Sequence, residues 1–94
     1  MYFAIVSQDV PNSLQLRQTA RPDHIKRLEL LRNENRLLIA GPFPNPDGEG
    51  FTGSLVVADF ESLKVAKEWA DADPYMAAGV YADVMVKPYK KVLP

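Results

Sequence analysis

The segment Gly53–Phe60 reads GSLVVADF, and it decides the fold because its strand-forming residues leave no polar face. Side chains of a strand point alternately to the two faces of a sheet, and a sheet with one face in water alternates apolar with polar residues. Taken as a strand over Gly53–Asp59, the segment instead carries four central apolar side chains, two for each face: Leu55, Val56, Val57 and Ala58. The pattern predicts a strand whose sheet is covered on both sides.

A strand and a helix are predicted on either side of this segment. Leu37–Ala40 is the preceding strand. The Pro- and Gly-rich stretch Pro42–Thr52 that follows it is interpreted as a plain surface loop, and the alternative is a flap over a pocket. Glu61 to about Asp71 follows as a helix. Its inner stripe is formed by apolar residues at helical spacing: Leu63, Ala66 and Ala70.

The first strand and the main helix lie toward the start of the chain. Tyr2–Ser7 is an aromatic and β-branched run that is typical of a strand. Ser13–Thr19 is interpreted as a helical turn or two. Pro22 is then predicted to open the main helix, because the first turn tolerates a residue without an N–H group. This helix should end near Asn33, where Asn35 can adopt the left-handed conformation.

With a last strand over Val80–Tyr89, the order of the elements is β-α-β-β-α-β. This order predicts one α+β, ferredoxin-like domain over residues 1–94, with a four-stranded antiparallel sheet and both helices on one of its faces. The other face is apolar too, so we expect a homodimer that packs sheet against sheet. The alternative is that these apolar side chains stay exposed on an open sheet that has no partner.

Composition excludes several classes of function. The 94 residues include 11 Lys and Arg against 12 Asp and Glu, so no general electrostatic attraction to nucleic acid or to acidic membranes is expected. The chain has no cysteine and a single histidine, which argues against thiolate and His-rich metal sites, and we predict neither a metal nor another cofactor. The opening stretch MYFAIVSQDV lacks a basic leader and becomes polar at Gln8, which predicts a cytoplasmic protein without a membrane segment.

Two motif matches do not fit their structural context. GEGFTG matches G-x-G-x-x-G through Gly48, Gly50 and Gly53, but it precedes a strand, so no helix N-terminus would meet a pyrophosphate. The segment KPYKKV near the chain end is basic, but such lysines are typical of a solvated strand edge. GSLVVADF also lacks the aromatic residues on which ferredoxin-like proteins stack RNA bases. We therefore predict neither a dinucleotide site nor a nucleic-acid partner.

The only histidine lies in Arg21–Leu28, which reads RPDHIKRL. At about 100° per residue, His24 shares a helical stripe with Leu28 and Leu31, so its imidazole should face the sheet. Burial and the positive end of the helix dipole would both favour the neutral ring, which can accept a proton. His24 is therefore a candidate general base. The alternative is a core histidine that is hydrogen-bonded to the backbone.

A general-base histidine needs a carboxylate to orient it and to stabilise its charged form. Asp23 is adjacent in sequence, so it should point away from His24 and favour the helix N-terminus. Asp73 precedes Pro74 and Tyr75, the pattern of an N-cap followed by proline at the first helical position. Asp73 is therefore either a cap alone or a cap that also holds the histidine, since a capping carboxylate is rigidly placed.

Five segments that together span nearly the entire chain resemble the YciI-like (YCII-related) family: RPDHIKRLELL, NRLLIAGPFP, FTGSLVVADFES, WADADPY and AGVYADVMVKPYKKV. The resemblance implies a ferredoxin-like fold that dimerises through its sheets as a dimeric α+β barrel. It also implies an active site centred on His24 and Asp73. Relatives commonly have glycine where this chain has Asn35, and asparagine tolerates the same backbone.

The fold does not select one reaction, because dimeric α+β barrels include muconolactone isomerases, dehydrochlorinase-like enzymes of aromatic breakdown, and proteins that only bind ligands or haem. Our primary hypothesis is a small enzyme that transfers a proton in an elimination or isomerisation of a small, cyclic or aromatic-derived metabolite. His24 would be the general acid/base and Asp73 its orienting carboxylate. Arg21 would contact an anion, and Tyr75 would form a pocket wall or donate a hydrogen bond. The alternative is a non-catalytic ligand-binding or interaction module with a structural His-Asp pair.

Overall fold

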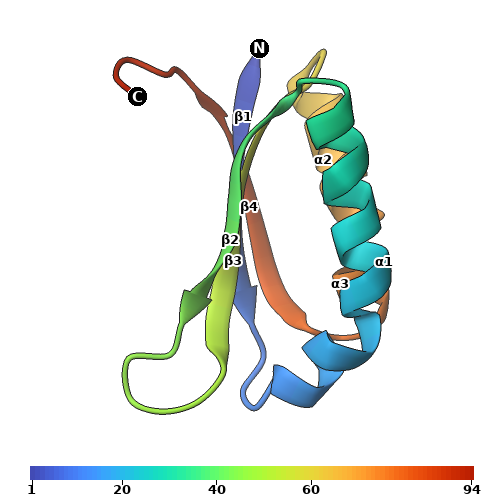
Figure 1. Cartoon of the computed structure of the whole chain (residues 1–94), viewed down its shortest axis with the longest axis vertical. Helices are drawn as coiled ribbons and strands as arrows, with labels where there is room; N and C mark the ends of the chain where they lie inside the picture. Colours follow the sequence, from blue (N-terminus) through green and yellow to red (C-terminus); the bar gives the residue numbers. More distant parts are fainter.

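Four antiparallel strands and three helices make up the computed structural model, which describes residues 1–94. Figure 1 shows the sheet nearly edge-on, with all the helices on one side of it and the other side uncovered. In chain order the elements are β1 (Tyr2–Asp9), α1 (Leu14–Asn33), β2 (Leu37–Pro44), β3 (Phe51–Asp59), α2 (Leu63–Asp71), α3 (Pro74–Ala77) and β4 (Tyr81–Tyr89).

The sheet has the strand order β2-β3-β1-β4, and every neighbouring pair is antiparallel. This is the order of the ferredoxin-like split βαβ arrangement, so the predicted fold class is confirmed. The first strand extends past its predicted end at Ser7 to Asp9, and β2 extends past Ala40 to Pro44. The loop predicted over Pro42–Thr52 is therefore shorter, since both of its ends belong to strands.

Helix α1 differs most from expectation. The prediction that Pro22 opens the main helix is wrong, because one continuous helix runs over Leu14–Asn33 with Pro22 inside it. An interior proline removes one backbone hydrogen bond, but Pro22 lies on the exposed side, where water can satisfy the freed carbonyl. The buried residues of α1 lie both before and after the proline, so packing holds the two halves in line: Arg17, His24 and Leu31. The predicted helix end is confirmed, and Asn35 has a φ of 57°.

Helix α2 begins two residues later than predicted. The Ser62 hydroxyl accepts a hydrogen bond of 3.1 Å from the Val65 N–H group, which fixes the first turn. Ala66 and Ala70 are buried as predicted. Leu63 was expected in the same inner stripe, which is wrong, because its side chain is exposed at the first residue of the helix. The helix approaches the sheet through its two alanines.

The hydrophobic core lies between the helices and one face of the sheet. Alternate residues of the two central strands supply the sheet side, since Phe3 pairs with Ala58 and Ile5 pairs with Val56. The buried cluster consists of Phe3, Ile5, Leu31, Val56, Ala58, Phe60, Ala66 and Ala70.

The opposite face of the sheet is also apolar but has no cover in this chain. Val6 pairs with Leu55 on one side and with Met85 on the other, so these three side chains lie side by side on that face. Large apolar side chains remain exposed along it: Ile39, Phe43, Met85 and Tyr89. No helix of the chain has the length and apolar character needed to cross a membrane.

Candidate functional site

A cavity of about 410 Å³ lies between α1 and the edge of the sheet formed by β2 and β3. Arg17, Arg21 and His24 reach it from α1, Ser54 reaches it from β3, and Tyr75 reaches it from α3. Apolar residues such as Leu28 and Val56 form much of the remaining wall. No aspartate or glutamate is among the residues that line the cavity.

His24 lines this cavity and contacts Asp73. The imidazole Nδ1 is 2.9 Å from Oδ1 and 3.0 Å from Oδ2 of Asp73, and both side chains are buried. Because a carboxylate only accepts hydrogen bonds, Nδ1 carries the proton and Nε2 of the neutral ring is an acceptor. Nε2 makes no hydrogen bond within the chain. Every side-chain nitrogen and oxygen that is fully buried has a hydrogen-bond partner, so Nε2 is not one of the fully buried atoms. Nε2 is therefore open to the cavity that His24 lines.

Asp73 is held in place by its second contact. Oδ1 accepts a hydrogen bond of 2.9 Å from the backbone N–H of Tyr75, which confirms the predicted N-cap at the start of α3. One carboxylate thus caps a helical turn and fixes the imidazole. Asp73 does not itself line the cavity, so it lies behind His24.

Tyr75 packs directly on the histidine. The two rings are stacked with their centroids 3.9 Å apart and an angle of 6° between their planes. Burial raises the pKa of the Tyr75 hydroxyl, and the positive charges of Arg17 and Arg21 oppose this rise. The phenol is therefore a hydrogen-bond donor near neutral pH, with both guanidinium groups close to it.

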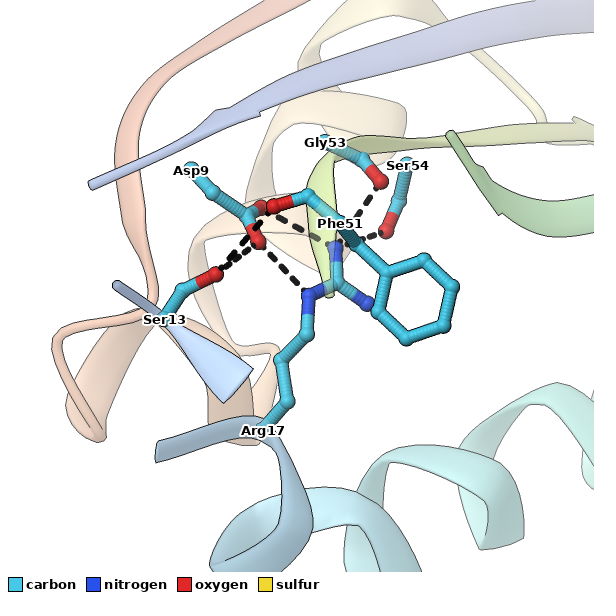
Figure 2. A network of polar contacts seen from close by, with 6 residues as sticks. All are labelled: Asp9, Ser13, Arg17, Phe51, Gly53 and Ser54. Carbon is cyan, nitrogen blue, oxygen red and sulfur yellow. Dashed lines mark hydrogen bonds and ion pairs between the residues drawn. The ribbon is translucent and has the colours of Figure 1, made fainter. Parts of the chain in front are cut away.

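Arg17 lies in a buried network that the sequence reasoning missed (Figure 2). Its Nε donates to Oδ2 of Asp9 over 2.6 Å, and its Nη2 donates to Oδ1 over 3.0 Å. Nη2 also donates to the Gly53 carbonyl at 2.9 Å and to the Ser54 hydroxyl at 2.8 Å. Ser13 donates to the same carboxylate at 2.5 Å. Burial lowers the pKa of Arg17, but the hydrogen bond and charge of Asp9 outweigh it and raise the pKa, so the guanidinium stays charged.

The other predicted site residues lie in different surroundings. Arg21 lines the cavity with an exposed side chain that makes no ion pair. Asp23 is exposed in the middle of α1, so its expected role at the helix N-terminus is wrong. The expected dipole effect on His24 is wrong for the same reason, because the effect is confined to the first turn and His24 is in mid-helix.

A sequence signal for Arg17 did exist. Arg17, His24 and Leu31 are spaced by seven residues, which is close to two helical turns. Starting the helix at Pro22 removed Arg17 from the stripe that already contained the other two. Asp9 and Ser54 gave no comparable signal, because they reach the network through strand pairing.

No group of three or more His, Cys, Asp or Glu side chains lies close enough together to hold a metal ion. The network around Arg17 contains one carboxylate, and the pair at His24 contains one more. The prediction of a site without a metal or cofactor continues to rest on the sequence.

Comparison with known proteins places the chain among close relatives. It is 57% identical to an uncharacterised protein of Haemophilus influenzae and 56% identical to protein YciI of Escherichia coli, with 98% of this chain and 99% of each relative covered. A solved structure of the 5-chloro-2-hydroxyhydroquinone dehydrochlorinase TftG from Burkholderia phenoliruptrix, in complex with 2,5-dihydroxybenzoquinone, has a TM-score of 0.84 at 30% identity, covering 96% of this chain and 94% of TftG. The model of the YCII-related domain matches residues 1–90. The chain therefore belongs to the YCII-related family.

Proposed function

We propose that this protein is a small enzyme that transfers a proton in an elimination or isomerisation of a small, cyclic or aromatic-derived metabolite. The observation that carries the proposal is the orientation of His24. Its Nδ1 is fixed by both oxygens of Asp73, while Nε2 is free to accept a proton from a molecule in the cavity. The roles of His24 and Asp73 in catalysis are part of this proposal.

The pair supplies what a general base needs. When Nε2 takes a proton, the ring becomes an imidazolium, and the adjacent Asp73 carboxylate stabilises the new charge. Because the Tyr75 N–H also bonds to Asp73, the carboxylate does not need to reorient during the reaction. The charged ring can then return the proton to another atom of the same ligand, which gives an isomerisation, or to a leaving group, which gives an elimination.

The likeness to TftG supports this reaction class. TftG is named as a dehydrochlorinase of a hydroxylated hydroquinone, and a dehydrochlorination removes one proton and one chloride from its substrate. The identity of 30% between the two chains leaves the substrate of this protein as a separate question.

The proposal is tested by turnover of hydroxylated and chlorinated hydroquinones, including 5-chloro-2-hydroxyhydroquinone, followed by chloride release and absorbance across a range of pH. We expect His24→Gln to lower kcat/KM by roughly 10²- to 10⁴-fold, the usual contribution of a positioned acid/base group. Asp73→Asn keeps a cap oxygen for the Tyr75 N–H and should also lower the rate. Asp71→Asn changes an exposed aspartate of the same segment and is the matched control. Undiminished activity in both His24→Gln and Asp73→Asn would overturn the proposal.

A ligand-binding module is the second candidate, because Asp73 is buried behind His24 and does not reach the cavity wall. In that case the pair is structural. His24→Gln would then lower the free energy of unfolding by about 1–3 kcal/mol, as for loss of a buried hydrogen-bond partner, while ligand affinity stays the same.

We also propose that the protein is a homodimer joined through the uncovered face of the sheet. The support is the row of exposed apolar side chains on that face, including Ile39, Phe43 and Met85. A two-fold contact covers this face in both copies at once. The cytoplasmic location remains a prediction from the sequence.

A further inference from the structure

We propose that Arg17 and the Tyr75 hydroxyl form an oxyanion subsite beside His24, so that the ligand of this cavity is an organic anion carrying an enolate or phenolate oxygen. The inference deepens the proposed function, on which its catalytic meaning rests. It adds a recognition group that the His-Asp pair does not contain.

The charges around the cavity favour an anion. Arg17 and Arg21 line it, and no carboxylate does. The two carboxylates of the site, Asp9 and Asp73, both lie behind the residues that they hold. A ligand therefore meets the donor groups of the arginines first, and an oxyanion is attracted where a cation would be repelled.

Hydrogen-bond donors remain free on Arg17. A guanidinium has five N–H groups on three nitrogens. Nε and Nη2 are used by Asp9, Gly53 and Ser54, whereas no carboxylate or carbonyl accepts from Nη1. In Figure 2 this third nitrogen carries no dashed line. The Tyr75 hydroxyl also accepts a hydrogen bond from Arg17, which opposes the rise of the Tyr75 pKa. That contact still leaves at least one N–H group for a ligand. Every fully buried side-chain nitrogen has a hydrogen-bond partner, so Nη1 is not fully buried. Arg17 lines the cavity, which is the space that Nη1 can face.

Arg17 is also placed before a ligand arrives. Two bonds to Asp9 and one to the Gly53 carbonyl fix the plane of the guanidinium, and its Cζ lies 5.2 Å from the ring centroid of Phe51. A donor that is held in this way does not lose side-chain entropy on binding, unlike the exposed and unpaired Arg21.

Tyr75 brings the subsite next to the proton acceptor. Its ring lies parallel to the His24 ring at 3.9 Å, and the Arg17 Cζ is 5.2 Å from the same tyrosine ring. The proton acceptor, the phenol and the guanidinium are thus neighbours on one wall. When a base removes a proton next to a carbonyl or a ring hydroxyl, negative charge develops on that oxygen, and preorganised donors beside the base stabilise it.

The test is a calorimetric comparison of two quinones of nearly the same size. 2,5-Dihydroxybenzoquinone is a vinylogous acid and is anionic near neutral pH, whereas 2,5-dimethylbenzoquinone is neutral. We expect the anion to bind at least tenfold more tightly, because hydrogen bonds to a charged oxygen are stronger than those to a neutral one. Equal affinities, or no binding of either compound, would overturn the inference.

Variants assign this preference to the subsite. Tyr75→Phe should reduce the preference for the anion several-fold. Tyr89→Phe is the matched control, because Tyr89 is exposed at the end of β4 and does not line the cavity. Arg17→Lys keeps a charge near Asp9 and should remove most of the preference. If Arg17→Lys fails to fold, the comparison of Tyr75→Phe with Tyr89→Phe still tests the subsite. An equal loss of the preference in both variants would contradict the subsite.

The two proposals fail separately. His24→Gln should keep the preference for the anion, because the donors on Arg17 and Tyr75 remain. If His24→Gln keeps both the preference and full turnover, the acid/base proposal falls and the subsite stands. If the wild-type protein turns over substrate but binds both quinones equally, the subsite falls and the acid/base proposal stands.

Discussion

At the scale of single residues, the site depends on side chains with two partners. Asp73 caps α3 and holds His24, while Asp9 holds Arg17 and accepts from Ser13. Each carboxylate therefore joins a structural contact to a cavity-lining group. A substitution at either position changes stability and ligand chemistry together, so single variants there need a measurement of each.

Tyr81 provides a prediction about alkaline pH. Burial raises its pKa from 10.0 to about 12, with Ser54 opposing the shift through a hydrogen bond. Between these values the unfolded chain has lost the phenolic proton and the folded chain retains it, so the free energy of unfolding falls as the pH rises. The loss should reach roughly 1–2 kcal/mol by pH 12, after allowance for partial exposure.

Urea unfolding at a series of pH values measures this loss, and tyrosinate absorbance follows the titration itself. Tyr81→Phe should remove this part of the alkaline destabilisation and the titration step near pH 12. An unfolding free energy whose pH dependence is the same in Tyr81→Phe as in the wild type would contradict the assignment.

At the scale of elements, the sequence was most informative where packing and local preference agree. The strand over Gly53–Asp59 and the cap at Asp73 both follow from short patterns, and both are present. The start of α1 was mispredicted because Pro22 favours a helix start, while tertiary contacts of Arg17 and His24 override that preference. Strand pairing between Ser7 and Ser54 places the polar groups beneath Arg17, and such long-range register is not readable from one sequence.

Pro22 supplies a prediction at this scale. Pro22→Ala restores an N–H group inside α1 and removes a ring that crowds the preceding turn, so it should stabilise the protein by about 1–2 kcal/mol. Part of the gain is offset because alanine leaves the unfolded chain more flexible. Thermal and urea unfolding measure the change.

The neighbouring exposed residue serves as the control for this experiment. Asp23→Ala touches no buried group and should alter stability by less than about 0.5 kcal/mol. A Pro22→Ala protein that is less stable than the wild type would show that the proline fits α1 without cost.

At the scale of the whole molecule, the two faces of the sheet have different surroundings. The helices cover one face of the sheet (Figure 1), and the cavity lies at the edge of that face. The other face exposes apolar side chains along its outer strands. The homodimer proposed above would remove this second surface from water and add core to a chain of only 94 residues.

A single charge tests the proposed dimer. Met85→Lys places an ammonium group on the uncovered face, where a sheet-to-sheet contact would bury it without a partner, so we expect dissociation to monomers. Light scattering coupled to size-exclusion chromatography measures the mass. Leu30→Lys changes an exposed leucine of α1 in the helix layer and should leave the mass unchanged. A wild-type protein that is monomeric at micromolar concentration would contradict the proposal.

The spacing of Arg17 and His24 on one helix has a last consequence. Their separation is set by the pitch of α1, so the helix fixes the distance between the guanidinium and the imidazole. One residue inserted or deleted between them would rotate one side chain relative to the other by about 100° and turn it out of the cavity. Loops of this protein can change length without moving these two groups, whereas the stretch between them has a fixed length.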